Sequence, residues 1–343
     1  MSPDIAFTLP GNRGKNPYRV SRYTPDTDFE AWNKALRGAD NGTIFQDHSF
    51  LAYHPDGRFE NHHLIFWVGE EPRVVLTGVD REVDGQRALV SYPGASYGGL
   101  THPPGLSFTQ SAHLTQTFIR YAKSEGFKKI SLTQPPSIYS TWPEDYVAFN
   151  LLKSGFSYVK REITQAIPLI YPDGDIFKTL CNKTRTAIRK AMKSELRVAE
   201  DLDLTDENLE TFYPLLTDNR ARLGVTPTHS LDELKKLRDL IGDKLSLTLI
   251  YLKDIPVAGI LNFICNPRVV LIFYVCHDWD YQEYRPVPLL VYSTMQWAYR
   301  NGFRHLDFGT STLNMDPNWG LIKFKENFGS LGYFRDTLTI DLT

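Results

Sequence analysis

The sequence has few cysteines, no long apolar run and little net charge, and each shortage excludes a class of protein. Its 343 residues include three cysteines without C-x-x-C spacing, so we expect no metal site and reduced, buried cysteines. The longest apolar run, residues 269–276, is too short to cross a bilayer and predicts a buried strand. A net charge of −2 excludes the overall basicity of a dedicated nucleic-acid binder.

A secretory signal and the short motifs of common nucleotide-binding and hydrolase folds are also missing. Residues 1–10 have no basic region followed by an apolar segment, so we expect a cytoplasmic protein without a secretory signal. The chain has no P-loop, Rossmann fingerprint or nucleophile elbow. Its histidines are scattered without ligand spacing, and a structural role is the expectation for most of them.

What the sequence does contain is an internal repeat. Residues 121–132 align with residues 297–308, and both segments read as a helix end, a Gly-Phe stop and a strand entry. Gly126 and Gly302 suit the left-handed position after a helix, and the following phenylalanine can pack back on the last turn. The repeat predicts two related lobes, and ligands commonly bind in clefts at such junctions.

The pattern of elements predicts a mixed α/β (α+β) fold used twice. Each lobe has a mixed, largely antiparallel sheet with flanking helices, and we expect a ligand cleft between or beside the lobes. The lobes are expected at residues 1–170 and 171–343, joined by a linker at 171–175. Strands are expected at 18–23, 64–68, 74–80, 87–92, 129–132, 158–170, 196–199, 245–252, 257–265, 269–276, 305–308 and 333–342, and helices at 26–36, 107–125, 145–154, 176–194, 207–223, 230–241, 289–301 and 321–327.

A basic helix opens the second lobe. Residues 176–197 contain seven lysines and arginines and one acidic residue, Glu195, while the apolar residues recur at helical spacing. Such a cationic face suits the phosphates of a nucleotide sugar or of an RNA acceptor stem, with Arg185 and Arg189 as candidate contacts. The alternative is an ordinary solvated helix face.

A glycine-rich loop at residues 92–105 precedes the repeat helix of the first lobe. Its glycines would let the backbone approach a ligand, which makes Tyr97, Gly98 and Gly99 candidate binding residues. The matching loop of the second lobe, residues 277–288, has no glycine and carries prolines that remove N–H donors. Tyr284 and Arg285 of that loop are candidate cleft residues. Ordinary loop structure is the alternative for both.

The third candidate segment follows the last strand of the repeat. Asp307 ends a buried strand, where polar side chains tend to face a cleft. Lys325 lies between Phe324 and Phe328 and is expected at a cleft rim, where it would offer a cation to an oxyanion; a surface lysine is the alternative. The other candidate binding residues here and near a helix start are Lys323 and His229.

Two of these segments resemble a known family. The run G-L-I-K-F-K-E-N-F-G at 320–329 and the run K-T-R-T-A-I-R-K-A at 183–191 resemble motifs of FemAB-like and BioF2-like proteins, which are tandem GNAT folds. The resemblance implies transfer of an acyl or aminoacyl group to an amine of a sugar, peptide or cell-envelope precursor. It also implies oxyanion stabilisation by Lys325 and a contribution from Arg185 and Arg189. Residues after about 320 would return to the first lobe.

The resemblance further implies an acyl donor as co-substrate, aminoacyl-tRNA or acyl-CoA, rather than a tightly bound cofactor. Aminoacyl-tRNA would contact the basic helix at 176–197, and the acceptor would be a small molecule or precursor. The chain lacks the long coiled-coil arm of some members and the glycine signature of a CoA-binding loop in its second lobe. Two alternatives stay open: a CoA- or acyl-carrier-dependent N-acyltransferase of a small metabolite, and a non-catalytic binding module. We expect Lys325→Ala to lower turnover with little effect on folding.

Overall fold

The computed structural model describes residues 17–171 and 173–342, and it contains two compact units. The N-terminal residues expected to lack a secretory signal, and Pro172 of the expected linker, lie outside the described part. Among the described residues, the first unit comprises 17–47, 54–161 and 335–342, and the second comprises 48–53 and 162–334. The division therefore falls at 161/162, within strand β8 (Ser157–Pro168), and not at 170/171 as the sequence suggested. Tyr171 is buried and stacks edge-on against Tyr299, so this end of the expected linker belongs to the second unit.

The first unit has two sheets with helices packed against them. One sheet has the strand order β1-β3-β4, and in the other the neighbours run β2-β5-β6-β7-β16. Helices α3 and α4 bury Phe118 and Leu151 against Ile130 of β7 in the core. The elements are β1 (Tyr18–Arg22), α1 (Pro25–Arg37), η1 (Ile44–Gln46), β2 (Glu60–Asn61), β3 (Leu64–Val68), β4 (Glu71–Leu76), β5 (Gly78–Val83), β6 (Gln86–Ser91), α3 (Phe108–Ser124), β7 (Lys129–Thr133), η2 (Ser137–Tyr139), α4 (Tyr146–Lys153) and most of β16 (Leu331–Asp341).

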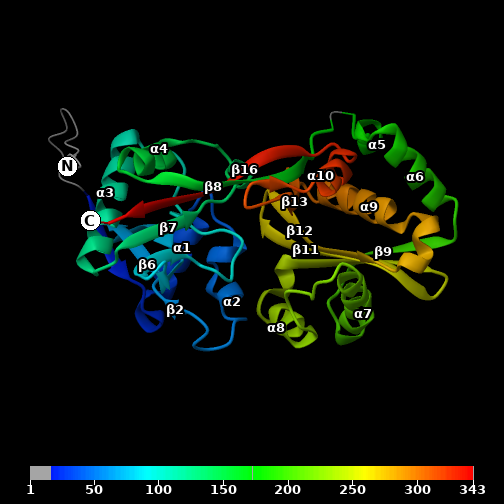
Figure 1. The fold of residues 1–343 in the computed structure, drawn as a ribbon, viewed down its shortest axis with the longest axis horizontal. Helices are drawn as coiled ribbons and strands as arrows, with labels where there is room; N and C mark the ends of the chain where they lie inside the picture. Colours follow the sequence, from blue (N-terminus) through cyan, green and yellow to red (C-terminus); the bar gives the residue numbers. More distant parts are fainter. Residues whose placement is uncertain (1–16, 172, 343) are drawn as a thin grey trace. The chain divides into compact units, whose positions relative to one another are not determined.

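The second unit has a sheet with strand order β8-β13-β12-β11-β10-β9. Helices α7 and α8 cover one face of it, and α5, α6 and α9 lie on the other, where Ile188 and Leu290 pack over Ile260 (Figure 1). Its elements are α2 (His48–Leu51), the end of β8, α5 (Ile176–Thr179), α6 (Asn182–Met192), β9 (Leu196–Leu202), α7 (Asp206–Arg222), α8 (Leu231–Ile241), η3 (Gly242–Lys244), β10 (Leu245–Leu252), β11 (Ile255–Asn266), β12 (Val269–His277), η4 (Trp279–Tyr284), α9 (Pro286–Arg300), β13 (His305–Thr310), β14 (Thr312–Leu313), β15 (Asp316–Pro317) and α10 (Trp319–Glu326).

The two copies of the sequence repeat adopt the same local structure. Gly126 and Gly302 have φ values of 81° and 78°, which are the left-handed positions expected after α3 and α9. The next amides, of Phe127 and Phe303, each donate to a carbonyl five residues earlier, at 3.0 and 3.1 Å. Each copy then enters a strand that runs parallel to the strand before its helix: β6 with β7, and β12 with β13. The prediction of a mixed α/β fold is confirmed in both units.

Several expected elements differ from the structure. The expected helix at 176–194 is divided into α5 and α6, because Leu180 is buried in the core with extended backbone. The expected strand at 74–80 is divided between β4 and β5. The hairpin of β14 and β15 was not predicted, and Cys181 is half-buried, whereas Cys265 and Cys276 are buried as expected. Across the described part of the chain, no helix has the length and apolarity to span a bilayer.

Candidate functional site

The second unit holds a cavity of about 900 Å³. Four elements surround it: the first two turns of α6, the end of β12, the start of α9 with the preceding turn, and α10. On α10, Gly320, Lys323, Phe324 and Asn327 line the cavity, and this spacing is one face of a helix. The volume lies in the range of small-molecule sites.

The wall of the cavity is mostly apolar, and four of the residues that line it are basic. Lys183 and Lys190 come from α6, Arg285 precedes α9 and Lys323 comes from α10. None of the described residues that line the cavity is an aspartate or glutamate. Lys323 has an ion pair with Glu326 at 3.3 Å, but both side chains are largely exposed, so this pair neutralises little of the charge. The cavity therefore suits an anionic ligand.

The start of α9 offers few backbone donors to such a ligand. Pro286 and Pro288 occupy the first and third helical positions and have no N–H, which leaves Val287 as the donor between them. Arg285 has a positive φ of 59°, and its amide donates to the carbonyl of Gln282 at 3.1 Å. The prolines of this loop thus remove N–H donors here, as the sequence indicated, and an anionic ligand would depend mainly on side chains.

His277, at the end of β12, lines the same cavity. Burial lowers the pKa of His277 below 6.5, with a smaller contribution in the same direction from Arg222, while Asp278 acts in the opposite direction. The imidazole is therefore neutral at pH 7, with one nitrogen able to accept a proton. In the sequence, His277 is one of several scattered histidines without ligand spacing. Its position at the end of the strand before the repeat helix was the signal that could have identified it.

Strands β12 and β13 separate near the cavity. Their parallel pairing runs from Val269 opposite His305 to Leu271 opposite Asp307 and goes no further. Beyond it, β12 continues for six residues to His277, paired with β11 on its other side. An opening between parallel strands at their carboxyl ends is a common position for a ligand in α/β folds.

Lys325 does not lie at a cleft rim. It is 3% exposed, and its Nζ donates to the carbonyls of Gly309 and Thr310 at 2.8 and 3.0 Å and to Oγ of Ser311 at 2.8 Å. Burial lowers the pKa of Lys325 to about 8, against the opposing charge of Asp307. Against the expectation from sequence, we therefore expect Lys325→Ala to destabilise the fold, because the side chain donates to the buried Ser311 hydroxyl and to two partly buried carbonyls.

Asp307 is fully buried beneath the same turn. Its Oδ1 accepts from Thr164 Oγ1 and from the amide of Gly309, each at 2.7 Å. Asp307 thus fixes the backbone in the last part of β13 and, with Lys325, belongs to a buried network at the base of the hairpin. We call this set the hairpin-base network; its members are Glu162, Thr164, Gln165, Asp307, Ser311, Thr312 and Lys325.

Of the other candidates in the second unit, Arg285 and Lys323 line the cavity. Arg185 bonds to Asn182, and Arg189 lies 5.0 Å from the ring centroid of Phe177, so the structure places neither among the residues lining the cavity. Lys183 and Lys190 of the same helix take that place, because they lie on the face of α6 turned toward α10 and α9.

Two further candidates also lie outside the cavity lining. Tyr284 is half-buried with its ring 6.4 Å from that of Tyr281. His229 is buried beside α8, where Tyr274 bonds to both its amide and Nδ1, at 3.0 and 2.9 Å. Within the described residues, no three His, Cys, Asp or Glu side chains are grouped so as to hold a metal ion.

In the first unit, the glycines of the 92–105 loop permit close packing. A Cβ on Gly98 would lie 2.7 Å from Cβ and Oγ of Ser91, and one on Gly99 would lie 2.6 Å from Gln134. The amide of Gly98 donates to the carbonyl of Thr133 at 2.8 Å, and Tyr97 is buried against Tyr139. These contacts explain the glycines without a ligand.

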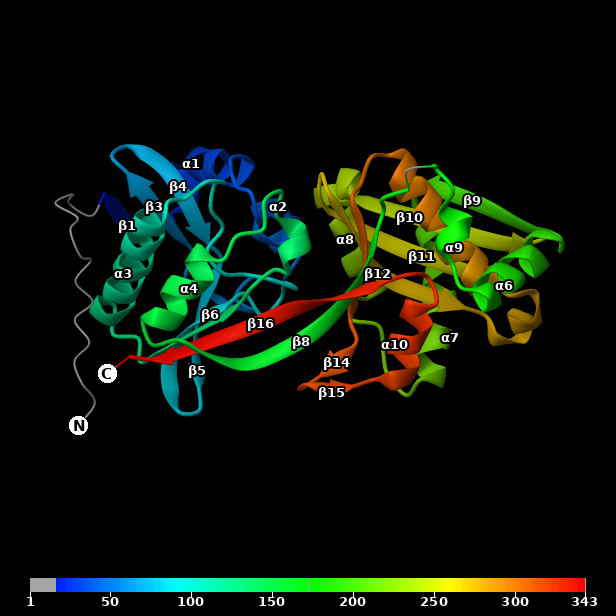
Figure 2. The ribbon, with the colours of Figure 1, turned by 90° about the horizontal axis from the view of Figure 1, so that it is seen from above.

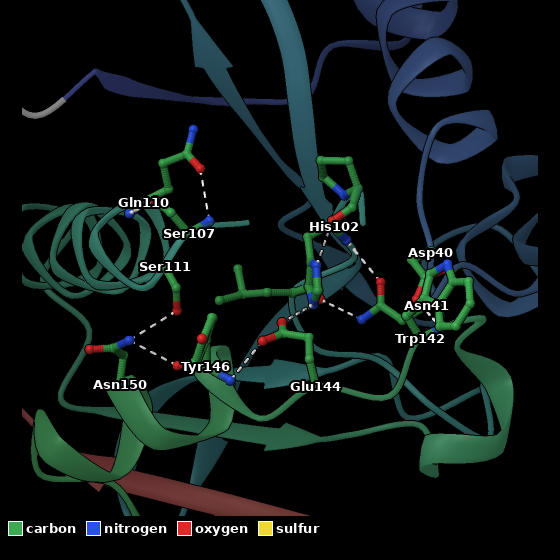
Figure 3. Close-up of polar contacts among 12 residues, drawn as sticks. Asp40, Asn41, His102, Ser107, Gln110, Ser111, Trp142, Glu144, Tyr146 and Asn150 are labelled. Atoms are coloured by element: carbon green, nitrogen blue, oxygen red, sulfur yellow. Dashed lines mark hydrogen bonds and ion pairs between the residues drawn. The ribbon is translucent and has the colours of Figure 1, made fainter. Parts of the chain in front are cut away.

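The end of this loop is held by a polar cluster that the sequence did not reveal (Figure 3). Asn41 accepts from the amide of His102 at 2.9 Å and donates to the carbonyl of Leu100 at 3.0 Å. Nε2 of His102 faces Oε1 of Glu144 at 3.9 Å, while the other carboxylate oxygen accepts from the amide of Tyr146 at 2.8 Å. Most of these bonds involve backbone groups, so the cluster mainly orders the loop.

Comparisons with known proteins agree with this architecture. Residues 181–319 match the family model of the acetyltransferase (GNAT) domain. The fold is similar to the crystal structure of FemX, with a TM-score of 0.70, 14% identity, and coverage of 94% of this chain and 97% of that one. It is also similar to L-PGS from Bacillus licheniformis, with a TM-score of 0.58, 12% identity, and coverage of 94% and 93%.

A third similar structure is a tandem GNAT protein from the clavulanic acid biosynthesis pathway, with a TM-score of 0.54, 12% identity, and coverage of 95% and 99%. A search of curated proteins gives no match to the sequence. At these identities the structural likeness shows the fold. Residues 181–319 are therefore similar to the acetyltransferase (GNAT) domain, and the chain has a fold shared with tandem GNAT proteins.

Proposed function

We propose that this protein is an N-acyltransferase that moves an acyl or aminoacyl group from a phosphate-bearing donor to an amine of a sugar, peptide or cell-envelope precursor. The observation that carries the proposal is the cationic cavity within and beside the GNAT domain, with neutral His277 in its wall. The cations bind the phosphates of the donor, and the acyl group is presented near His277.

The chemistry needs no covalent enzyme intermediate. The nitrogen lone pair of the acceptor amine attacks the acyl carbon, a C–N bond forms, and the C–O or C–S bond to the donor breaks. The amine loses a proton in this step. His277 is the residue of the cavity wall suited to accept it, because its burial keeps the imidazole neutral at pH 7.

The shortage of backbone N–H groups at the cavity favours an acyl donor that is bound by side chains. With Pro286 and Pro288 at the start of α9, a diphosphate finds one N–H where three would otherwise be available. Lys183 and Arg285 supply charge in its place. We therefore propose aminoacyl-tRNA, whose terminal phosphodiesters can be held by separate cations, ahead of acyl-CoA.

The test is a transfer assay on the purified protein with a panel of aminoacyl-tRNAs and acetyl-CoA against amino sugars, amino acids and peptides, read by mass spectrometry. Donor binding is measured in parallel for Lys183→Glu and Arg285→Glu. Each should weaken binding by about tenfold or more, since a favourable contact becomes repulsive. Arg189→Glu is the matched control, because Arg189 lies on α6 but does not line the cavity.

Three outcomes discriminate between the functions. Transfer from acetyl-CoA alone would replace the proposed donor with a CoA-dependent N-acyltransferase. Binding of a donor without transfer to any amine would indicate a non-catalytic binding module. Equal losses in Arg189→Glu and Lys183→Glu would remove the cavity as the donor site.

A further inference from the structure

The hairpin of β14 and β15 and the first turn of α10 form an exposed apolar protrusion on the second unit (Figure 2). Leu313 is 75% exposed, Met315 is 56%, Trp319 is 74% and Leu321 is 36%. Every residue from 313 to 321 is exposed. Four large apolar side chains gathered in nine consecutive residues are unusual on a soluble surface and mark an interaction site.

The protrusion is rigid at its base. Thr312 accepts from the amide of Ile163 at 2.9 Å and donates to Glu162, which is 3% exposed. The amide of Met315 reaches the same carboxylate at 3.4 Å, and Ser311 donates to Gln165 at 2.6 Å. The hairpin-base network therefore holds the tip in one conformation.

The tip itself carries local strain. Asn314 and Met315 both have positive φ values, 52° and 68°. Asparagine tolerates this region, but methionine adopts it rarely, so its backbone conformation has a cost. The structure thus maintains Met315 in an unfavourable conformation that keeps its side chain in solvent, which is consistent with a role for that side chain outside the folded chain.

Charge next to the apolar tip indicates which partner fits. Trp319 and Lys323 are four residues apart on α10, so they lie one above the other on the helix surface. Lys323 shares the cavity wall with Lys183, Lys190 and Arg285. An apolar tip with an interfacial tryptophan, followed one turn later by cations, is the pattern by which proteins bind an anionic lipid surface.

We propose that this protrusion docks on an anionic membrane, with Leu313, Met315 and Trp319 entering the headgroup region and Lys323 facing the lipid phosphates. Docking would bring lipid headgroups to the mouth of the cationic cavity, because Gly320, between Trp319 and Leu321, lines that cavity. Asp316 is the one carboxylate of the 313–321 segment and modestly opposes the attraction. This docking does not depend on the proposed acyl transfer.

The test is vesicle flotation of the whole chain with two compositions: phosphatidylcholine alone, and an equal mixture of phosphatidylcholine and phosphatidylglycerol. We expect binding to the mixed vesicles that weakens as salt is raised. The double variant Leu313→Ser with Trp319→Ser should reduce the bound fraction about tenfold, because two anchors are lost. Lys323→Glu should remove the preference for phosphatidylglycerol.

The matched control is Trp142→Ser in the first unit, since Trp142 is 73% exposed and Trp319 is 74% exposed. Thermal melting of each variant establishes that it is folded. The docking proposal is overturned if the wild-type chain floats with neither vesicle, if the double variant floats as well as wild type, or if Trp142→Ser causes the larger loss. A dimer in solution that the double variant dissociates would also overturn it, because a second copy of the chain would then cover the tip.

Discussion

Lys325 donates a hydrogen bond of 2.8 Å to Ser311, and this bond joins helix α10 to the base of the β14–β15 hairpin. Ser311 in turn donates to Gln165 of β8 at 2.6 Å. Lys325 therefore connects helix α10, which lines the cavity, to the hairpin that forms the protrusion. Its ammonium donates all three of its hydrogens inside the protein, two of them to backbone carbonyls.

Replacement of Lys325 by methionine should destabilise the fold. Lys325→Met preserves much of the volume but removes the donor from the buried Ser311 hydroxyl and from two partly buried carbonyls, and we expect the free energy of unfolding to fall by about 2–4 kcal/mol. Chemical denaturation measures this loss. Lys323→Met is the control, since the Lys323 side chain is 73% exposed and should change stability by less than about 0.5 kcal/mol. Equal stabilities of the two variants would contradict the structural role of Lys325.

The titration of Lys325 should appear in the pH dependence of stability. Burial lowers its pKa from 10.5 to about 8, so between these values the unfolded chain binds a proton that the folded chain does not. The free energy of unfolding should therefore rise with pH across this window, by up to about 1.4 kcal/mol per pH unit relative to Lys325→Met. Below pH 8 the difference should be constant. Guanidinium titrations from about pH 7 to about pH 10 check this, and parallel curves for the two proteins would contradict it.

Removal of the imidazole at position 277 should slow transfer without loss of donor binding. We expect His277→Gln to lower turnover about 100-fold, because the proton acceptor is lost. In the wild-type protein, turnover should fall as the pH drops below the lowered pKa of His277, since the protonated ring accepts no proton. His305→Gln is a matched control, because burial also lowers the pKa of His305 but this residue lies outside the cavity lining. An unchanged pH profile in His277→Gln would exclude His277 as the base.

The glycine-rich loop provides a test of packing against ligand binding. Gly98→Ala should cost about 1–3 kcal/mol of stability, because its Cβ would meet Ser91 at 2.7 Å. In a Ser91→Gly background the same substitution should cost less, and a double-mutant cycle measures the difference. If Gly98→Ala left stability unchanged and weakened ligand binding, the loop would be a binding element as the sequence suggested.

The sequence was sufficient for those features that depend on local patterns. The Gly126 and Gly302 stops require left-handed backbone, and only glycine adopts it freely, so both helix ends and the repeat were predicted correctly. The prolines in the first turn of α9 likewise revealed the shortage of N–H donors. The role of Lys325 was not accessible, because it depends on two carbonyls 15 and 16 residues away and a serine hydroxyl 14 residues away, in a segment that no periodicity marks.

Which basic residues of α6 face the cavity also could not be predicted. The run 183–191 that carried the family resemblance contains both pairs of basic residues: Arg185 and Arg189 were the candidates, but Lys183 and Lys190 line the cavity. The break at Leu180 determines where α6 begins and therefore which of its side chains face the cavity. The break arises because Leu180 is buried in the core of the second unit. Tertiary packing thus determines which face of this amphipathic helix lines the cavity.

The division of the chain into two units constrains the order in which strands can pair during synthesis. Residues 337–341 of β16 pair with β7 in the first unit, yet they are synthesised after the whole of the second unit. Until β16 is synthesised, the edge of β7 opposite β6 has no partner strand. By then, all the strands of the second unit's sheet from β8 to β13 have been synthesised. We therefore expect the unit that is synthesised first to be completed last during translation, with one edge of β7 unpaired until residues 337–341 emerge.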